Sequence, residues 1–119
     1  MSRLDRERRQ LARERWPVLA SLFEGPLGSR LVGERKGLAN EIDQLVAALP
    51  FSKREAAARE CCDFGDYFSK RYDEGRFIAD GFGLVEARHL REREGDARIK
   101  LLYASLAASL RHEKEGWKP

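Results

Sequence analysis

Apolar residues at helical spacing are the feature that most limits what this chain can fold into. The clearest set lies near the C-terminus and consists of Ile99, Leu102, Tyr103, Leu106 and Leu110. Steps of three or four residues place side chains along one face of an α-helix, which can then be buried. No alternating pattern typical of a β-strand persists for more than a few residues. The sequence therefore predicts an all-α protein.

The first predicted helix covers residues 2–24 and is interrupted at Pro17, which has no backbone N–H to donate. The residues before Pro17 are mostly charged, whereas apolar residues crowd together after it. We therefore expect the core to begin near Trp16, with residues 1–15 forming a charged helical arm that extends from the body.

Glycine and proline in residues 25–28 predict a turn, and Ser29 behind it is a plausible helix cap. The helix that follows should end at Pro50. Its apolar face consists of Leu31, Leu38, Ile42, Leu45 and Leu49.

A capping-box sequence from Ser52 to Glu55 predicts the start of the next helix. The apolar face of this helix consists of Ala57, Cys61, Phe64, Phe68 and Tyr72. Residues 75–83 are rich in glycine and aromatic residues, and we expect them to be the least regular segment. Helical character returns over 84–94, and Gly95-Asp96 begins the last helix.

The expected architecture is a four- to five-helix, bundle-like single domain over residues 1–119. A length of 119 residues suits one domain, and 42% hydrophobic with 36% charged residues is apolar enough to fold. Short connections at 25–28 and at Pro50-Phe51 favour antiparallel helix neighbours. We also expect Trp117 in the C-terminal tail to dock onto the body.

Residues that catalysis or metal binding requires are sparse. The chain has two cysteines, Cys61 and Cys62, and two histidines, His89 and His112. These lack the spacing of a zinc site, and Glu86-x-x-His89 matches a di-metal helix motif without a second copy. We therefore predict no catalytic residue, no metal and no cofactor, hence a protein that is not an enzyme. A regulatory thiol at Cys62 stays open.

The sequence contains no apolar run long enough to span a bilayer and no apolar secretory core near its N-terminus. The two cysteines are adjacent, which disfavours an intrachain disulfide and fits a reducing environment. We expect an intracellular, reducing compartment, the cytoplasm in the first place, with an organelle as the alternative.

The charge distribution is the feature most informative about partners. Residues 1–15 carry six arginines and three acids, so this segment alone has the formal net charge of the whole chain, +3. A basic segment on a neutral remainder attracts an acidic protein surface or nucleic acid. The acids between the arginines also allow a purely structural interpretation, an exposed helix stabilised by ion pairs four residues apart.

These observations favour a non-enzymatic interaction module, an accessory or assembly subunit of a larger protein complex. The alternative is a small regulator or inhibitor that binds a nucleic-acid-handling machine, or nucleic acid itself, through the basic N-terminal arm. A hydrophobic finger over residues 77–82 is a second candidate surface, with packing into the core as its alternative. The oligomeric state stays open. The predicted partner-binding residues are Arg3, Arg6, Arg8, Arg9, Arg13, Phe77, Ile78 and Phe82.

Overall fold

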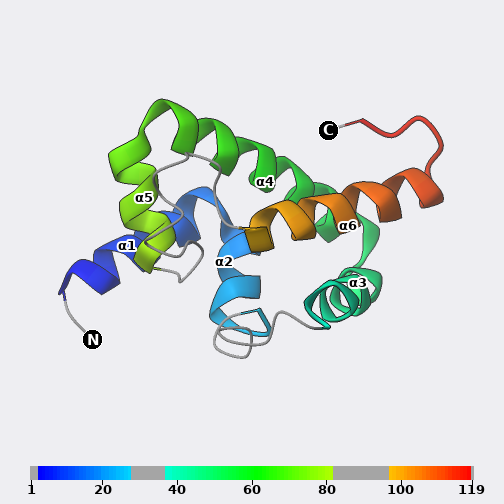
Figure 1. Cartoon of the computed structure of the whole chain (residues 1–119), viewed down its shortest axis with the longest axis horizontal. Helices are drawn as coiled ribbons and strands as arrows, with labels where there is room; N and C mark the ends of the chain where they lie inside the picture. The colour runs from blue at the N-terminus through cyan, green and yellow to red at the C-terminus, as the bar shows by residue number, and fades with distance from the viewer. Residues whose placement is uncertain (1–2, 28–36, 82–96, 119) are drawn as a thin grey trace.

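The structure is a computed structural model that describes residues 3–27, 37–81 and 97–118. These residues contain six α-helices and no β-strand, which confirms the all-α prediction (Figure 1). The helices are α1 (Arg3–Arg15), α2 (Pro17–Glu24), α3 (Leu38–Ala48), α4 (Phe51–Lys70), α5 (Tyr72–Gly81) and α6 (Ala97–Glu113).

The described residues form six helices, where we predicted four to five, and two local breaks account for the difference. Trp16 leaves the helical path before Pro17, as predicted, and so separates α1 from α2. Arg71 does the same between α4 and α5, where its N–H donates to the carbonyl of Tyr67. The prediction of an irregular segment from Gly75 was wrong up to Gly81, because these residues belong to α5.

The start of α4 also differs from the predicted capping box. Pro50 is the N-cap residue, no side chain caps the helix, and Ser52 lies inside it. Arg54 contacts neighbouring helices instead. Its Nε donates to the carbonyl of Leu49 at 3.0 Å and its Nη1 to Ser109 at 2.6 Å, while Nη2 pairs with Glu113. One half-buried guanidinium thus connects the end of α3, the start of α4 and α6.

Helix α4 is the longest of the described helices, and it contacts α2, α5 and α6 (Figure 1). Helix α3 packs mainly against α6, so the turn at Pro50-Phe51 does not make α3 and α4 the antiparallel neighbours that we expected. The Ser105 hydroxyl of α6 donates to the Asp43 carboxylate of α3 at 2.6 Å. The predicted Ser29 cap and the predicted helix over 84–94 lie outside the described residues.

The predicted apolar faces form the core. Ala57, Cys61, Phe64 and Phe68 on α4 are all buried, as are Ile99, Leu102, Leu106 and Leu110 on α6. Trp16 is 2% exposed and joins this core, as expected. Trp117 is also buried, and its Nε1 donates to Glu55 at 3.3 Å, which confirms that the tail docks.

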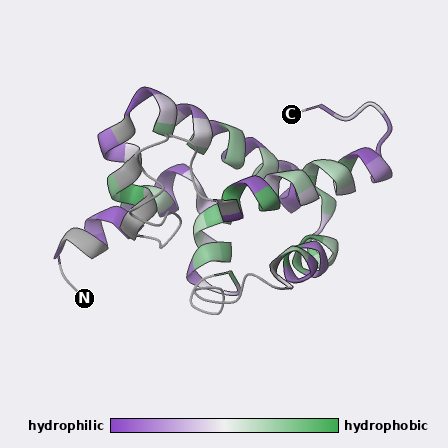
Figure 2. Ribbon diagram, viewed as in Figure 1, coloured by the Kyte–Doolittle hydropathy of each residue, from purple (hydrophilic) through white to green (hydrophobic). Residues whose placement is uncertain are grey.

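Helix α1 does not extend from the body as an arm over its described part. It packs against α2 and α5, and Ala12 is 3% exposed. Figure 2 shows that α1 is mostly hydrophilic and α2 mostly hydrophobic. Helix α1 therefore lies at the surface, whereas α2 contributes several buried side chains to the core. None of the described helices combines the length and apolarity needed to cross a membrane.

Gly75 and Gly65 provide a matched test of the contact between α4 and α5. A Cβ at Gly75 would lie 2.7 Å from Cα of Phe68, whereas a Cβ at Gly65 would meet no atom within 4 Å. We expect Gly75→Ala to lower the free energy of unfolding by about 1–3 kcal/mol through overpacking. Gly65→Ala should raise it by about 0.5–1 kcal/mol, since alanine favours a helix interior. Urea unfolding measures both, and an unchanged Gly75→Ala protein would argue against this close packing.

Candidate functional site

The α1–α2 elbow, residues Arg15 to Leu19, is the best-defined polar site in the described structure. Pro17 occupies the first position of α2, and no side chain of the elbow itself caps that helix. The carboxylate of Glu60 on α4 accepts the backbone N–H groups of Val18 and Leu19, at 3.3 and 3.0 Å. A carboxylate at a helix N-terminus satisfies amides that lack a partner within the helix and complements the helix dipole. Helix α4 thus supplies the cap of α2.

Asp63, one turn further along α4, holds the other side of the elbow. Its Oδ2 accepts Nε1 of Trp16 at 2.8 Å and Nε of Arg15 at 3.0 Å. Its Oδ1 accepts Nη2 of Arg15 at 3.3 Å. This carboxylate therefore pairs with an indole that the core has buried and with a cation that reaches solvent.

The aromatic rings around Trp16 are part of the same arrangement. Phe64 and Tyr67 approach the indole edge to face, with centroid distances of 5.0 and 5.3 Å. The guanidinium carbons of Arg15 and Arg71 lie 4.5 and 5.0 Å from the centroid of the Tyr67 ring. The Tyr67 hydroxyl donates to Glu74 at 2.8 Å, and burial together with this bond raises the Tyr67 pKa. The elbow is fixed by stacking as well as by charge.

The predicted site arginines are divided among three neighbours. Arg8 stacks on α5, with its guanidinium carbon 4.0 Å from the centroid of the Phe77 ring. Arg13 pairs with Glu24 of α2, from Nε to Oε1 at 2.9 Å. Arg3 pairs with Glu7 on its own helix at 3.1 Å. Arg6 is exposed and Arg9 is half-buried.

Helical spacing gives α1 two different sides. Arg8, Ala12 and Arg15 are spaced by four and three residues, and this side packs on the body through the contacts just described. Arg6, Arg9 and Arg13 are spaced by three and four residues and share the other side, which we call the arginine edge. Arg8 and Arg15 therefore contact the body from one side of α1. On the other side, Arg13 pairs with Glu24 of α2 and Arg6 is exposed.

Phe77 and Ile78, the described residues of the predicted hydrophobic finger, do not form an exposed finger. Ile78 is 1% exposed and belongs to the core, and Phe77 is half-buried beneath Arg8. The reason is that residues 72–81 are helical, so Ile78 faces inward with the other core residues. The alternative of core packing fits both side chains. Phe82 lies outside the described residues.

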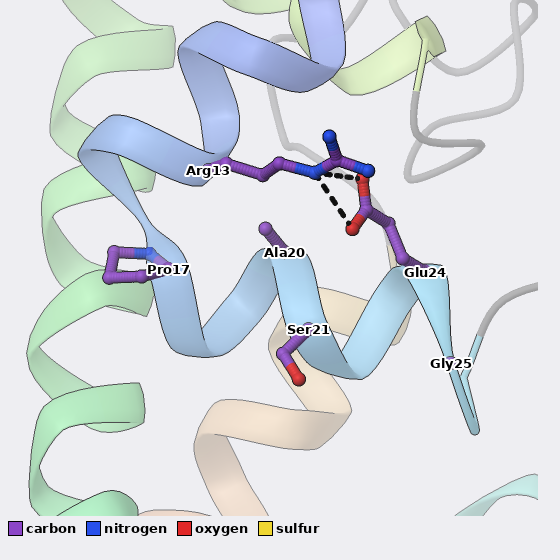
Figure 3. A pocket seen from close by; sticks show the side chains of 6 residues that line it. All are labelled: Arg13, Pro17, Ala20, Ser21, Glu24 and Gly25. Carbon is purple, nitrogen blue, oxygen red and sulfur yellow. Dashed lines mark hydrogen bonds and ion pairs between the residues drawn. The ribbon is translucent and has the colours of Figure 1, made fainter.

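A hollow of about 450 Å³ lies beside the arginine edge (Figure 3). We call it the α1–α2 hollow, and its lining residues are Arg13, Pro17, Ala20, Ser21, Glu24 and Gly25. Figure 3 shows Arg13 reaching across above Ala20 to meet Glu24. The remaining lining side chains are small, so the hollow can accept a side chain from another molecule.

Groups with nucleophilic or metal-binding chemistry do not converge within the described parts of the chain. Burial raises the pKa of the Cys61 thiol far above its usual range, which keeps it protonated. Cys62 is exposed and contacts the hydroxyl of Tyr103. Across residues 3–27, 37–81 and 97–118, no three His, Cys, Asp or Glu side chains are grouped to hold a metal ion. Glu86 and His89 lie outside these ranges.

Comparisons with protein-family models, with curated proteins and with solved structures find no match to this chain.

Sequence reasoning did not identify Glu60, Asp63 and Glu24 as partners of the elbow and of Arg13. Glu60, Asp63 and Tyr67 follow each other at helical spacing on α4, next to the predicted apolar face. This spacing could have suggested that the three side chains form a polar strip beside the buried face of α4. It does not indicate which residues from other helices bind them.

Asp63 provides the first test of the elbow. Asp63→Ala leaves the buried Nε1–H of Trp16 without its acceptor, so we expect the free energy of unfolding to fall by about 1–3 kcal/mol. Asp63→Asn keeps an oxygen for Trp16 and should cost less. Asp66→Ala, which removes only an exposed pair with Lys70, should change stability by about 0.5 kcal/mol or less. Equal effects of Asp63→Ala and Asp66→Ala, measured by urea unfolding, would contradict the role assigned to Asp63.

Glu60 provides a test that depends on pH. Burial raises its pKa above 4.5, and the nearby Asp63 adds to the shift, although the two N–H groups oppose it. The folded state therefore binds this proton more tightly than the unfolded state, so the contribution of Glu60 is greatest below pH 4.5 and is lost as pH rises through the folded-state pKa.

We expect the stability of the native protein relative to Glu60→Gln to decline as pH rises from the acidic range to neutrality. Urea unfolding of both proteins over this pH range gives the difference directly. A difference for Glu60→Gln that grows with pH would contradict the direction of the shift.

Proposed function

We propose that this chain is a non-enzymatic helical interaction module, an accessory or assembly subunit of a larger protein complex, and that it binds its partner through the arginine edge of α1. The observation that carries the proposal is that α1 is fixed on one side and presents arginines on the other. Arg15, Trp16 and Asp63 hold its end, and Arg8 stacks on Phe77. A preformed basic edge loses little conformational entropy on binding, which favours affinity.

A protein partner has more support than nucleic acid. Proteins that bind single strands stack bases on exposed aromatic rings. Among the aromatic side chains that the structure describes, none is exposed, and the rings nearest α1 already stack against Arg8, Arg15 and Arg71. Acids also alternate with the arginines in the sequence of α1 and lower its net positive charge, whereas binding to a phosphate backbone favours a high positive charge.

The test is capture of partners by the tagged full-length protein from its native cell extract, at low and high salt and with or without nuclease. We expect a stoichiometric protein partner that withstands nuclease. The triple variant Arg6→Ala, Arg9→Ala, Arg13→Ala should weaken binding of that partner by about tenfold or more.

The matched control removes three cations from exposed positions elsewhere, as Lys53→Ala, Arg59→Ala, Arg111→Ala. It should retain the partner, because its net charge changes equally but the arginine edge is intact. Equal losses in both triple variants would contradict a specific role for α1. Recovery that collapses with nuclease would favour the nucleic-acid alternative, in which binding also weakens steeply with salt.

A further inference from the structure

The α1–α2 hollow combines an apolar floor with a cation at its rim. Pro17 provides exposed apolar surface above Ala20, which is buried in the core, and Ser21 and Gly25 have little or no side chain to fill the space. A volume of about 450 Å³ is more than one large apolar side chain occupies and lies within the usual range for binding pockets. Figure 3 shows the ion pair of Arg13 and Glu24 spanning one side of it.

The way in which Arg13 pairs with Glu24 leaves most of its guanidinium available. Both hydrogen bonds to the carboxylate come from Nε, at 2.9 and 3.1 Å. A guanidinium has five N–H donors, so within the described part of the chain the four on the Nη groups remain for another acceptor. Two parallel N–H groups are the arrangement that binds a second carboxylate in bidentate fashion. Glu24 thereby orients Arg13 as well as pairing with it.

The arginine edge continues from the hollow along α1. Arg6 lies two helical turns before Arg13, about 10 Å along the helix axis, with Arg9 between them. An occupant that extends from the hollow along this edge therefore passes from Arg13 to the exposed Arg6. The complementary molecule carries acids at a similar spacing and an apolar group at one end.

We infer that the α1–α2 hollow docks an acidic segment of a partner protein, with an apolar side chain on the exposed ring of Pro17 and a carboxylate on the Nη groups of Arg13. This inference rests on the proposed function and specifies the chemistry of the partner. The partner is expected to be acidic because the Nη groups of Arg13 are cationic. It is expected to be a polypeptide because a phosphate backbone has no apolar side chain to place on the apolar floor of the hollow.

The experiment measures fluorescence anisotropy of a labelled peptide of about ten residues, rich in glutamate and carrying one central leucine. The native full-length protein should bind it more tightly than the same peptide with glycine in place of leucine, by about fivefold or more. An oligothymidine of similar charge should bind no better than the glycine peptide. Equal affinity for the three probes would overturn the inference, because charge alone would then explain binding.

Two substitutions test the two parts of the site. Arg13→Ala should weaken binding of the leucine peptide by about tenfold, and Arg13→Lys by less, since lysine keeps the charge but not the paired donors. Ser21→Trp places a bulky ring at an exposed position of α2 and should reduce the leucine peptide to the affinity of the glycine peptide. Ser21→Glu adds a negative charge at the same place and should have the same direction of effect. Full affinity in Arg13→Ala, or in both Ser21 variants, would overturn the inference.

Matched controls are Arg59→Ala and Ser69→Trp, both at exposed helical positions of α4. Each should bind the leucine peptide within about twofold of the native protein. Circular dichroism checks that every variant is folded, and the two Ser21 variants substitute for each other if one is not. If the captured partner binds Arg13→Ala and Ser21→Trp as it binds the native protein, the docking site is wrong and the interaction module stands. If no protein partner is captured, the proposed function fails whatever the peptide shows.

Discussion

The interruption of the first helix at Pro17 is the constraint on which the rest of the structure depends. Proline cannot donate the hydrogen bond that would continue α1, so the chain turns at Trp16 and α2 begins with backbone amides in need of an acceptor. Glu60 accepts two of them from α4, and Asp63 binds Arg15 and Trp16 on the same face. The elbow thereby fixes the direction of α1, the burial of α2 and the position of Trp16 in the core.

The same elbow determines which arginines are structural. Because Arg15 pairs with Asp63 and Arg8 stacks on Phe77, one side of α1 is packed against the rest of the protein. The opposite side then carries Arg6, Arg9 and Arg13, and it borders α2 where the outer surface is hollowed. A charge count cannot distinguish these two groups, because they alternate along the same helix. Which arginines contact the protein and which do not becomes clear only once the position of α1 on α2 and α5 is known.

Local patterns explain how much of the fold the sequence predicts. The apolar face of α6 and the break at Pro17 were predictable because each depends on neighbouring residues alone. The cap from Glu60 was not, since it joins positions more than forty residues apart and a half-buried carboxylate resembles a solvated one in sequence. The prediction at Gly75 was wrong because its role also depends on a residue from another helix. Glycine indicates an irregular segment when read alone, but here it allows α5 to approach Phe68 closely.

The preference for arginine over lysine in α1 has a structural explanation. The helix contains six arginines and no lysine. Arg15 uses the edge of its guanidinium to bind Asp63 and its face to cover Tyr67, 4.5 Å from the ring centroid. A lysine ammonium has no planar face and no fixed pair of donors, so it could not make both contacts at once. Part of the basic charge of α1 is therefore required by the fold itself, through contacts that join a guanidinium to a carboxylate and an aromatic ring at once.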